Sequence, residues 1–271
     1  LRVLGKNKTN YHYLQSIVTF LPDLYDLIQI SKSNSPEIYI RGKYSKALEK
    51  EGGDTLVKNM ILFLKKKFNL KDNFRIIVKK NIPLGAGLGG GSADAAAVAR
   101  LIIRMFNLKI KKQEIIKQFI QIGADIPACF FLCNQKVEGI GDKLSKLRLL
   151  NKTVWVVLIK PRVFFKTKEV FENHVKPFSK KLIFNYNFEN LLKDMNFVDN
   201  DLQEAAIKLS TSYSKLLINL PRKNAITIPR MTGSGSTIFI LCRSQKSANL
   251  YLNSIENVTK GCWKKISRIF L

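Results

Sequence analysis

The stretch from Pro83 to Ala97, PLGAGLGGGSADAAA, constrains the fold more than any other part of the chain. It places five glycines within seven positions, 85–91. Because glycine has no Cβ, such a segment turns sharply and lets a bulky anion approach its backbone N–H groups. The alanine-rich sequence from about Ser92 predicts a helix whose positive N-terminal end faces the same spot. With the strand expected at Phe74–Val78, the pattern is typical of a phosphate-binding loop.

Three common phosphate-binding loops fit this stretch poorly. Gly85, Gly87 and Gly90 formally match the dinucleotide fingerprint. However, Pro83 interrupts the expected strand, and the acidic residue expected about 20 positions later is replaced by the lysine-rich segment Leu108–Lys112. A Walker A loop requires a lysine that is absent here, and the glycine loop of protein kinases lies in a hairpin. A glycine-rich turn without any ligand is the remaining structural alternative.

Hydrophobic periodicity divides the rest of the chain into two mixed α+β units, with a boundary near residue 152. Strands or strand-like segments are expected at Leu14–Ile30, Glu37–Ile40, Phe74–Val78, Val154–Ile159, Ile226–Met231, Thr237–Cys242 and Ile266–Phe270. Helices are expected at Thr55–Phe68, Gln113–Ile122, Thr167–Asn173, Asp201–Leu217 and Ala248–Val258, besides the alanine-rich helix.

Composition narrows the functional classes. The 46 lysines and arginines against 20 acidic residues give a net charge of +26, but the cations are spread along the chain. Spread charge favours compositional bias over a specific nucleic-acid surface, although a basic nucleic-acid-binding protein stays an alternative. Two histidines and four cysteines without a CxxC pair exclude a zinc constellation. No apolar run has the length of a membrane span and no signal-peptide pattern opens the chain, so we expect a cytoplasmic protein with reduced, buried thiols.

Pro83 to Ser92 resembles the pattern Pro-x-x-x-Gly-Leu-Gly-small-small-Ser/Ala of the GHMP kinase superfamily. Within that superfamily the chain resembles the 4-diphosphocytidyl-2-C-methyl-D-erythritol kinases over nearly its whole length. The glycine loop in its GLGGGSADAAA form is accompanied by six further matches, in this order along the chain: NYHYLQSIVTFL (Asn10–Leu21), GADIPACF (Gly123–Phe130), VEGIGDKL (Val137–Leu144), KPRVFFKTKEVF (Lys160–Phe171), NDL (Asn200–Leu202) and MTGSGSTIFIL (Met231–Leu241).

The resemblance implies a two-domain α+β fold with the active site between the domains. Residues 1–152 would form an ATP-binding domain like domain 2 of ribosomal protein S5, and residues 153–271 a ferredoxin-like domain. The implied activity is transfer of the γ-phosphoryl group of MgATP to the 2-hydroxyl of the cytidine-diphosphate-linked methylerythritol of the non-mevalonate isoprenoid pathway. The implied protein is a monomer or homodimer without a specific nucleic-acid or membrane partner. A GHMP kinase for another alcohol and an RNA-binding S5-like protein without catalysis are the alternatives.

The resemblance also assigns residues. The loop that would bind ATP comprises Pro83, Leu84, Gly85, Ala86, Gly87, Leu88, Gly89, Gly90, Gly91, Ser92 and Ala93. The residues that would hold the alcohol substrate or lie near the transferred phosphate are Tyr11, His12, Thr167, Phe171, Gly233, Ser234 and Gly235.

Each role has an ordinary structural alternative. Asp125 would be the catalytic carboxylate, whereas its position in Gly-Ala-Asp-Ile-Pro also suits a helix cap. Ser92 would contribute a hydroxyl to Mg²⁺ or phosphate, or cap its helix, or both. Packing alone would explain Phe171, and Gly233–Gly235 also reads as a hairpin turn. The family opens with a strand carrying Pro-Ala-Lys-x-Asn, whose lysine works with the aspartate. The present sequence lacks that segment, so we expect the first strand and the partner lysine to be missing.

Overall fold

The structure is a computed structural model that describes residues 1–8, 11–147, 153–174, 177–183 and 199–270. Two compact units alternate along the chain. The first comprises Leu1–Asp23, Gly85–Leu88 and Cys133–Leu271, and the second comprises Leu24–Leu84 and Gly89–Leu132. The glycine loop therefore contributes to both units. The domain boundary expected near residue 152 stays a prediction.

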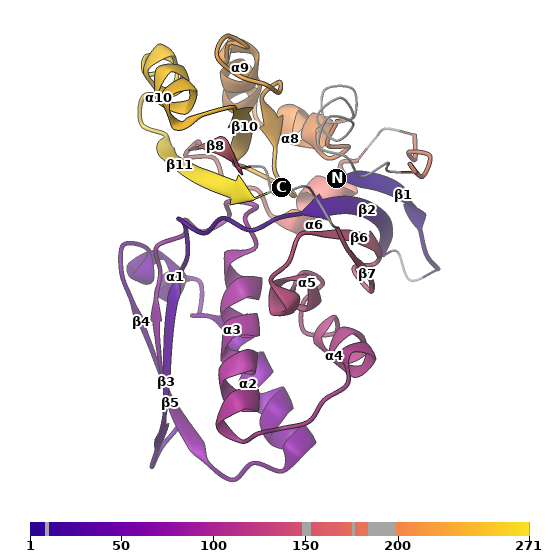
Figure 1. Ribbon diagram of the computed structural model, residues 1–271, viewed down its shortest axis with the longest axis vertical. Helices are drawn as coiled ribbons and strands as arrows, with labels where there is room; N and C mark the ends of the chain where they lie inside the picture. Colours follow the sequence, from indigo (N-terminus) through magenta and orange to yellow (C-terminus); the bar gives the residue numbers. More distant parts are fainter. Residues whose placement is uncertain (9–10, 148–152, 175–176, 184–198, 271) are drawn as a thin grey trace. The chain divides into compact units, whose positions relative to one another are not determined.

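The second unit is a three-stranded sheet covered on one face by helices (Figure 1). Its strand order is β3 (Leu27–Ser33), β5 (Asn73–Lys79) and β4 (Glu37–Arg41), with β5 antiparallel to β3 and parallel to β4. Alternate residues of β5 are buried, as expected for a sheet with one covered face. Helices α2 (Thr55–Phe68) and α3 (Gly90–Met105) pack on that face. Helices α1 (Ser45–Lys50), α4 (Lys112–Phe119) and α5 (Ile126–Phe131) complete the unit.

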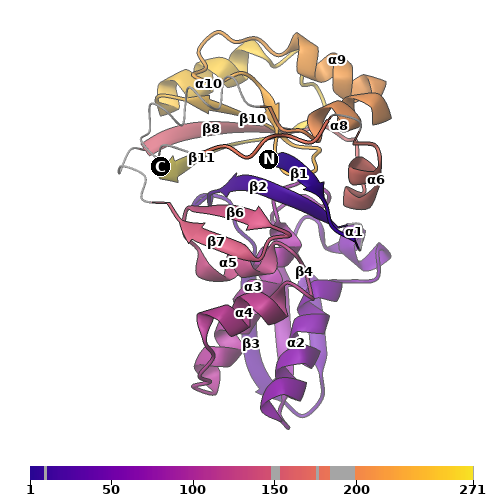
Figure 2. The ribbon, with the colours of Figure 1, turned by 90° about the vertical axis from the view of Figure 1, so that its right-hand side faces the viewer.

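The first unit contains two antiparallel four-stranded sheets among its described residues. One has the order β1 (Arg2–Lys6), β2 (His12–Val18), β6 (Gln135–Gly139) and β7 (Lys143–Lys146). The other has the order β11 (Trp263–Phe270), β8 (Thr153–Lys160), β10 (Ile238–Cys242) and β9 (Arg230–Met231). Helices α8 (Gln203–Leu209), α9 (Thr211–Asn219) and α10 (Gln245–Ser254) cover one face of this second sheet (Figure 2). Helix α6 (Thr167–Glu172) also belongs to the first unit.

The hydrophobic core of the first unit joins these elements. Val157 and Ile159 of β8 pack in one buried cluster with Tyr213 of α9 and Tyr251 of α10. Val3 of β1 belongs to the same cluster, so the first strand of the chain is anchored in this core. In the register of β1 on β2, Val3 lies opposite Leu14 and Lys6 lies opposite His12. His12 is the first residue of β2, and Tyr11 directly precedes it.

Most expected elements are confirmed, and the differences have local causes. The single helix expected at Asp201–Leu217 is wrong, because Ser210 is extended and its hydroxyl accepts the Tyr213 N–H to begin α9. The strand expected at Ile226–Met231 is reduced to Arg230–Met231. The alanine-rich helix begins at Gly90, two residues before Ser92. In the described part of the chain, the short elements α1, α5, β1, β6 and β7 were not expected from periodicity.

The described residues bear on two expectations from composition, one on membrane-spanning helices and one on the cysteines. No helix in the described ranges has both the length and the apolar character needed to cross a membrane. All four cysteines are free. Cys129 and Cys242 are buried, as expected, whereas Cys133 and Cys262 are only half-buried.

Candidate active site

The glycine loop owes its conformation to three residues with left-handed backbones. Gly85, Gly87 and Gly89 have φ values of 57°, 65° and 67°, a region that residues with a side chain rarely adopt. Gly89 is the N-cap of α3, and its carbonyl accepts the Ala93 N–H at 2.8 Å. A glycine in this conformation can begin the helix without a capping side chain, so α3 starts at Gly90. Ser92 therefore lies inside the first turn and does not cap the helix.

The middle of the glycine loop is held by a second glycine turn that lies about 145 residues later in the chain. The Thr237 N–H donates to the Ala86 carbonyl at 3.2 Å, and the Thr232 hydroxyl donates to the Gly87 carbonyl at 3.4 Å. A Cβ on Gly87 would lie 2.5 Å from the Thr232 carbonyl oxygen and 2.6 Å from that of Gly235. Both segments belong to the first unit. The two backbones thus approach so closely that only glycine fits.

The second turn, Thr232–Thr237, connects β9 and β10 as the expected hairpin. Asn200 stabilises this turn: its side-chain amide donates hydrogen bonds to the carbonyls of Met231 at 2.9 Å and Gly233 at 2.7 Å. Asn200 belongs to the NDL motif, which had been noted only as a family match. The sequence does not predict this role, because the carbonyls that Asn200 binds lie 31 and 33 residues later in the chain.

The residues expected to hold the alcohol substrate gather in the first unit. The rings of His12 and Phe171 lie with centroids 4.7 Å apart, and the hydroxyls of Thr167 and Ser234 are 2.9 Å apart. Burial, followed by the nearby charges of Lys6 and His174, lowers the pKa of His12 below its usual value, which favours the neutral imidazole.

His12 and its neighbour differ in their surroundings. The Nε2 atom of His12 is buried and has no hydrogen-bond partner among the residues that the structure describes. Tyr11 instead is 65% exposed, so its ring is available to a ligand. Phe171 also packs against the hydrophobic core of the unit, and packing therefore explains part of its position.

Asp125 stands at the N-cap position of α5, in the second unit. Its side chain accepts no capping hydrogen bond from this helix, so capping does not account for the carboxylate. Although the residue is exposed at the surface, desolvation by the protein around it raises the pKa of the carboxyl. The nearby Cys129 is buried, which raises the pKa of its thiol to about 12 and leaves it protonated at neutral pH.

The residues at the start of α3 suit phosphate groups, and they supply little for a metal ion on their own. A Cβ built on Gly89 would meet only the Cys129 sulfur, at 4.0 Å, so this side of the loop is open. The first N–H groups of α3 have no intrahelical partner, and the helix dipole favours an anion there. In the described part of the chain, no group of three or more His, Cys, Asp or Glu side chains is arranged to hold a metal ion. The Ser92 hydroxyl, in the first turn of α3, is a protein group that suits a metal ion held by phosphates.

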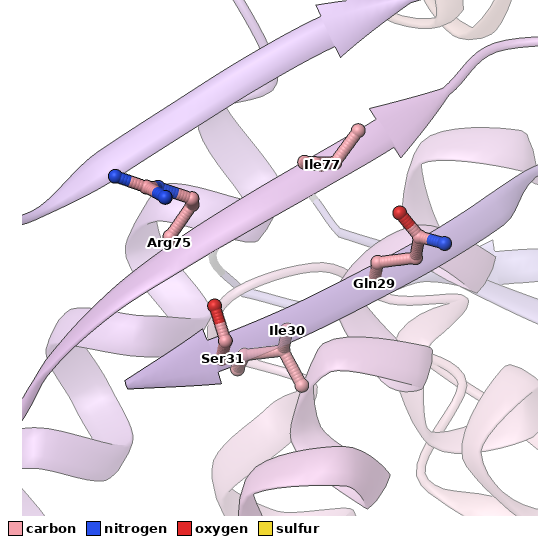
Figure 3. A pocket seen from close by; sticks show the side chains of 5 residues that line it. All are labelled: Gln29, Ile30, Ser31, Arg75 and Ile77. Carbon is pink, nitrogen blue, oxygen red and sulfur yellow. The ribbon is translucent and has the colours of Figure 1, made fainter. Parts of the chain in front are cut away.

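A shallow hollow lies elsewhere in the second unit, on strands β3 and β5 (Figure 3). Its lining residues are Gln29, Ile30, Ser31, Arg75 and Ile77. It contains no residue of the glycine loop and not Asp125. The hollow therefore has no part in the candidate site.

The sequence is similar to a known kinase family and to curated kinases of two bacteria. Residues 55–132 match the family described as GHMP kinases N terminal domain. The chain is 31% identical to 4-diphosphocytidyl-2-C-methyl-D-erythritol kinase of Clostridioides difficile, over 91% of this chain and 84% of that protein. It is 33% identical to the protein of the same name from Clostridium perfringens, over 88% of this chain and 83% of that protein.

The fold is also found among solved structures. The crystal structure of a 4-(cytidine 5'-diphospho)-2C-methyl-D-erythritol kinase superimposes with a TM-score of 0.76 at 22% identity, covering 100% of this chain and 95% of that chain. The mixed α+β architecture expected from the sequence is thus confirmed for the described residues.

Proposed function

We propose, because the chain belongs to the GHMP kinase family of ATP-dependent small-molecule kinases, that it phosphorylates the 2-hydroxyl of 4-diphosphocytidyl-2-C-methyl-D-erythritol. The relatives that carry this name are about one-third identical over most of the chain. The acceptor alcohol is the proposed part of this assignment.

One observation carries the choice of acceptor. His12, the helix α6 with Thr167 and Phe171, and Ser234 come from three separate parts of the sequence, and the four side chains lie as two contacting pairs in one unit. A neutral imidazole can hydrogen-bond the edge of a pyrimidine, and an exposed ring such as Tyr11 can stack on its face. The unpartnered Nε2 of His12 is a hydrogen-bonding group that the described residues leave unused. These residues support recognition of a cytidine group.

ATP would bind with its phosphates against the glycine loop. The open side of Gly89 and the first N–H groups of α3 supply donors and a favourable dipole for the phosphate oxygens. Mg²⁺, which we expect to bind with the nucleotide, would neutralise negative charge on these phosphates. The hydroxyl of Ser92 is the protein group that we expect to contribute there.

Asp125 would receive the proton of the attacking hydroxyl. Its side chain is not engaged in capping α5, and its raised pKa brings it closer to that of an efficient general base at neutral pH. In the ionised form it accepts the proton as the hydroxyl oxygen attacks the γ-phosphorus and ADP leaves. Phosphoryl transfer otherwise depends on positioning and charge stabilisation.

The decisive experiment measures ADP release by the full chain with MgATP and a panel of alcohols. The panel contains the cytidylylated methylerythritol, the same polyol phosphate without its cytidylyl group, homoserine, mevalonate and galactose. We expect turnover only with the first, and phosphorus NMR should place the new phosphate on the 2-hydroxyl. Turnover confined to another alcohol would refute the proposed acceptor. RNA binding without any phosphoryl transfer would favour the nucleic-acid alternative.

A further inference from the structure

A buried ion cluster lies at the base of the glycine loop, within the second unit. Lys80 follows β5 directly and is only 2% exposed. Its ammonium group forms ion pairs with the carboxylates of Asp26 and Asp94, which are almost completely buried themselves. Asp26 immediately precedes β3, and Asp94 lies on α3. One cation thus joins its own segment to a residue 54 positions before it and to another 14 positions after it.

The cluster holds more acidic groups than one lysine can balance. Asp54, whose carboxyl caps α2 by accepting the Val57 N–H at 3.1 Å, also hydrogen-bonds to Asp94. Burial raises the pKa of both Asp94 and Asp54, which favours a proton shared between them. Burial alone would lower the pKa of Lys80, but Asp94 and Asp26 outweigh it, so the lysine stays charged. Removing one partner from such a buried pair leaves an uncompensated charge in the protein interior, which is destabilising.

Asp26 also binds the backbone that leads into the glycine loop. Its second carboxylate oxygen accepts the N–H of Asn81 at 2.5 Å and that of Ile82 at 2.9 Å. Asp26 therefore connects Lys80 to the residues just before Pro83.

The other end of the loop returns to the same place. A Cβ on Gly90, the first residue of α3, would lie 3.3 Å from Cγ2 of Ile82 and 3.7 Å from the Asp26 carboxylate. Asp94, one turn further along α3, holds Lys80 from this side. The entry and the exit of the loop are therefore both fixed to one buried ammonium group.

We propose that Lys80, Asp26 and Asp94 form a clasp that sets the spacing between Ile82 and Gly90 and so pre-organises the glycine loop for nucleotide phosphates. These three are positioning residues, since they act through the loop backbone. The inference rests on the proposed function only in that the loop binds ATP, and it is independent of which alcohol accepts the phosphate.

A clasp and an ordinary structural ion pair predict different kinetic effects. If the cluster only stabilised the fold, its loss would lower thermal stability and leave the folded enzyme unchanged. If it positions the loop, the folded variant should bind nucleotide more weakly, because the loop must then be ordered during binding. The KM for the alcohol should stay the same.

The principal variant is Lys80→Met with Asp94→Asn, which removes one positive and one negative group together. Calorimetric titration of the full chain with a non-hydrolysable ATP analogue and Mg²⁺ should show affinity reduced by about tenfold or more. The kcat at saturating ATP should change by less than about threefold, because Asp125 is untouched. Hydrogen exchange at the amides of residues 82–90 should become faster.

The matched control is Lys67→Met with Glu114→Gln. This pair is also an ion pair of the second unit, but it joins α2 to α4 rather than to the glycine loop. Its removal should leave nucleotide affinity and exchange in residues 82–90 unchanged. Asp26→Asn is the second test variant, because asparagine keeps an oxygen for the two backbone N–H groups while weakening the link to Lys80. This variant should also lower the affinity for nucleotide. Because asparagine has nearly the volume of aspartate, Asp26→Asn keeps the test possible if the double variant does not fold.

Wild-type nucleotide affinity in either folded test variant would overturn the clasp, and so would an equal loss of affinity for nucleotide and alcohol. A wild-type chain that does not bind the ATP analogue would overturn it as well. If the wild type binds the analogue but does not phosphorylate the cytidylylated alcohol, the proposed function fails while the clasp is still tested by the same titration.

Discussion

At the residue scale, the chemistry of the proposed reaction depends on the protonation state of Asp125. Desolvation raises the pKa of its carboxyl above the ordinary value, and only the ionised form can accept a proton. Turnover should therefore rise with pH through this raised pKa, on an acidic limb that lies above the usual value of about 4 for an aspartate. A pH profile of kcat with saturating substrates measures this limb. A kcat that is independent of pH through the acidic range would show that no carboxylate limits the reaction.

Replacement of the carboxylate tests the same role directly. Asp125→Asn keeps the size and polarity of the side chain but abolishes its basicity, so kcat should fall by about 10²–10⁴-fold. The affinity for ATP should change little, and calorimetry checks it independently of turnover. Asp72→Asn is the matched control, since Asp72 is a partly exposed residue of the same unit that pairs with Lys32. Equal activity in the two variants would reduce Asp125 to a structural residue.

At the element scale, the contact between the two glycine turns predicts an unequal cost for two identical substitutions. Gly87→Ala must accept a left-handed backbone and also place a Cβ against two carbonyl oxygens. Gly52→Ala must also accept a positive φ, of 90°, but its Cβ would meet nothing within 4 Å. Thermal denaturation should show only the conformational cost for Gly52→Ala, about 1–2 kcal/mol, and a clearly larger loss for Gly87→Ala. Similar losses would mean that the two turns can move apart without cost.

Asp23 predicts a pH-dependent contribution to the first unit. Its carboxylate forms two hydrogen bonds with the guanidinium of Arg268 on β11, at 3.0 and 2.8 Å. These hydrogen bonds hold the pKa of Asp23 well below its usual range. Because the folded-state pKa is lowered, the stabilisation is present above the unfolded pKa of about 4 and is lost as the pH falls through the folded value.

The melting temperature should therefore be lower for Asp23→Asn than for the wild type at neutral pH. The difference should shrink as the pH falls below about 4. The effect should be small, because exposed ion pairs contribute only about 0–1 kcal/mol. A difference that stayed constant down to low pH would assign the effect to something other than the charge on Asp23.

At the scale of the whole molecule, the net charge of +26 predicts nonspecific attraction to polyanions. Binding of mixed-sequence RNA should fall steeply between about 50 mM and about 200 mM salt, as expected for release of counterions. Phosphoryl transfer should persist at the higher salt concentration, where RNA no longer binds. Filter binding and ADP release on the same preparation would compare the two. Sequence-selective RNA binding that survives the higher salt would support the rival function.

Local sequence patterns determined most of the longer helices and strands of this protein, and the position of its glycine loop. The helix at Thr55–Phe68 occurs with the bounds that its periodicity predicts, and the glycine-rich stretch forms a loop before a helix. The helix break at Ser210 was missed because the flanking segments share one apolar period, although the Ser210 side chain supplies a local capping hydrogen bond. Short elements such as α5 carry too few residues for a periodic signal.

The tertiary structure decided which distant segments meet. The motif signature selected Gly87, Gly235 and Asp125, but it did not show that Gly87 and Gly235 touch each other through their backbones. Nor did any pattern pair Lys80 with Asp26 and Asp94, since charged residues are usually expected at the surface. The physical reason is the range of the interactions involved. Backbone conformation and helix formation depend on neighbours within a few residues, whereas backbone contacts and buried ion pairs depend on packing that only the complete fold provides.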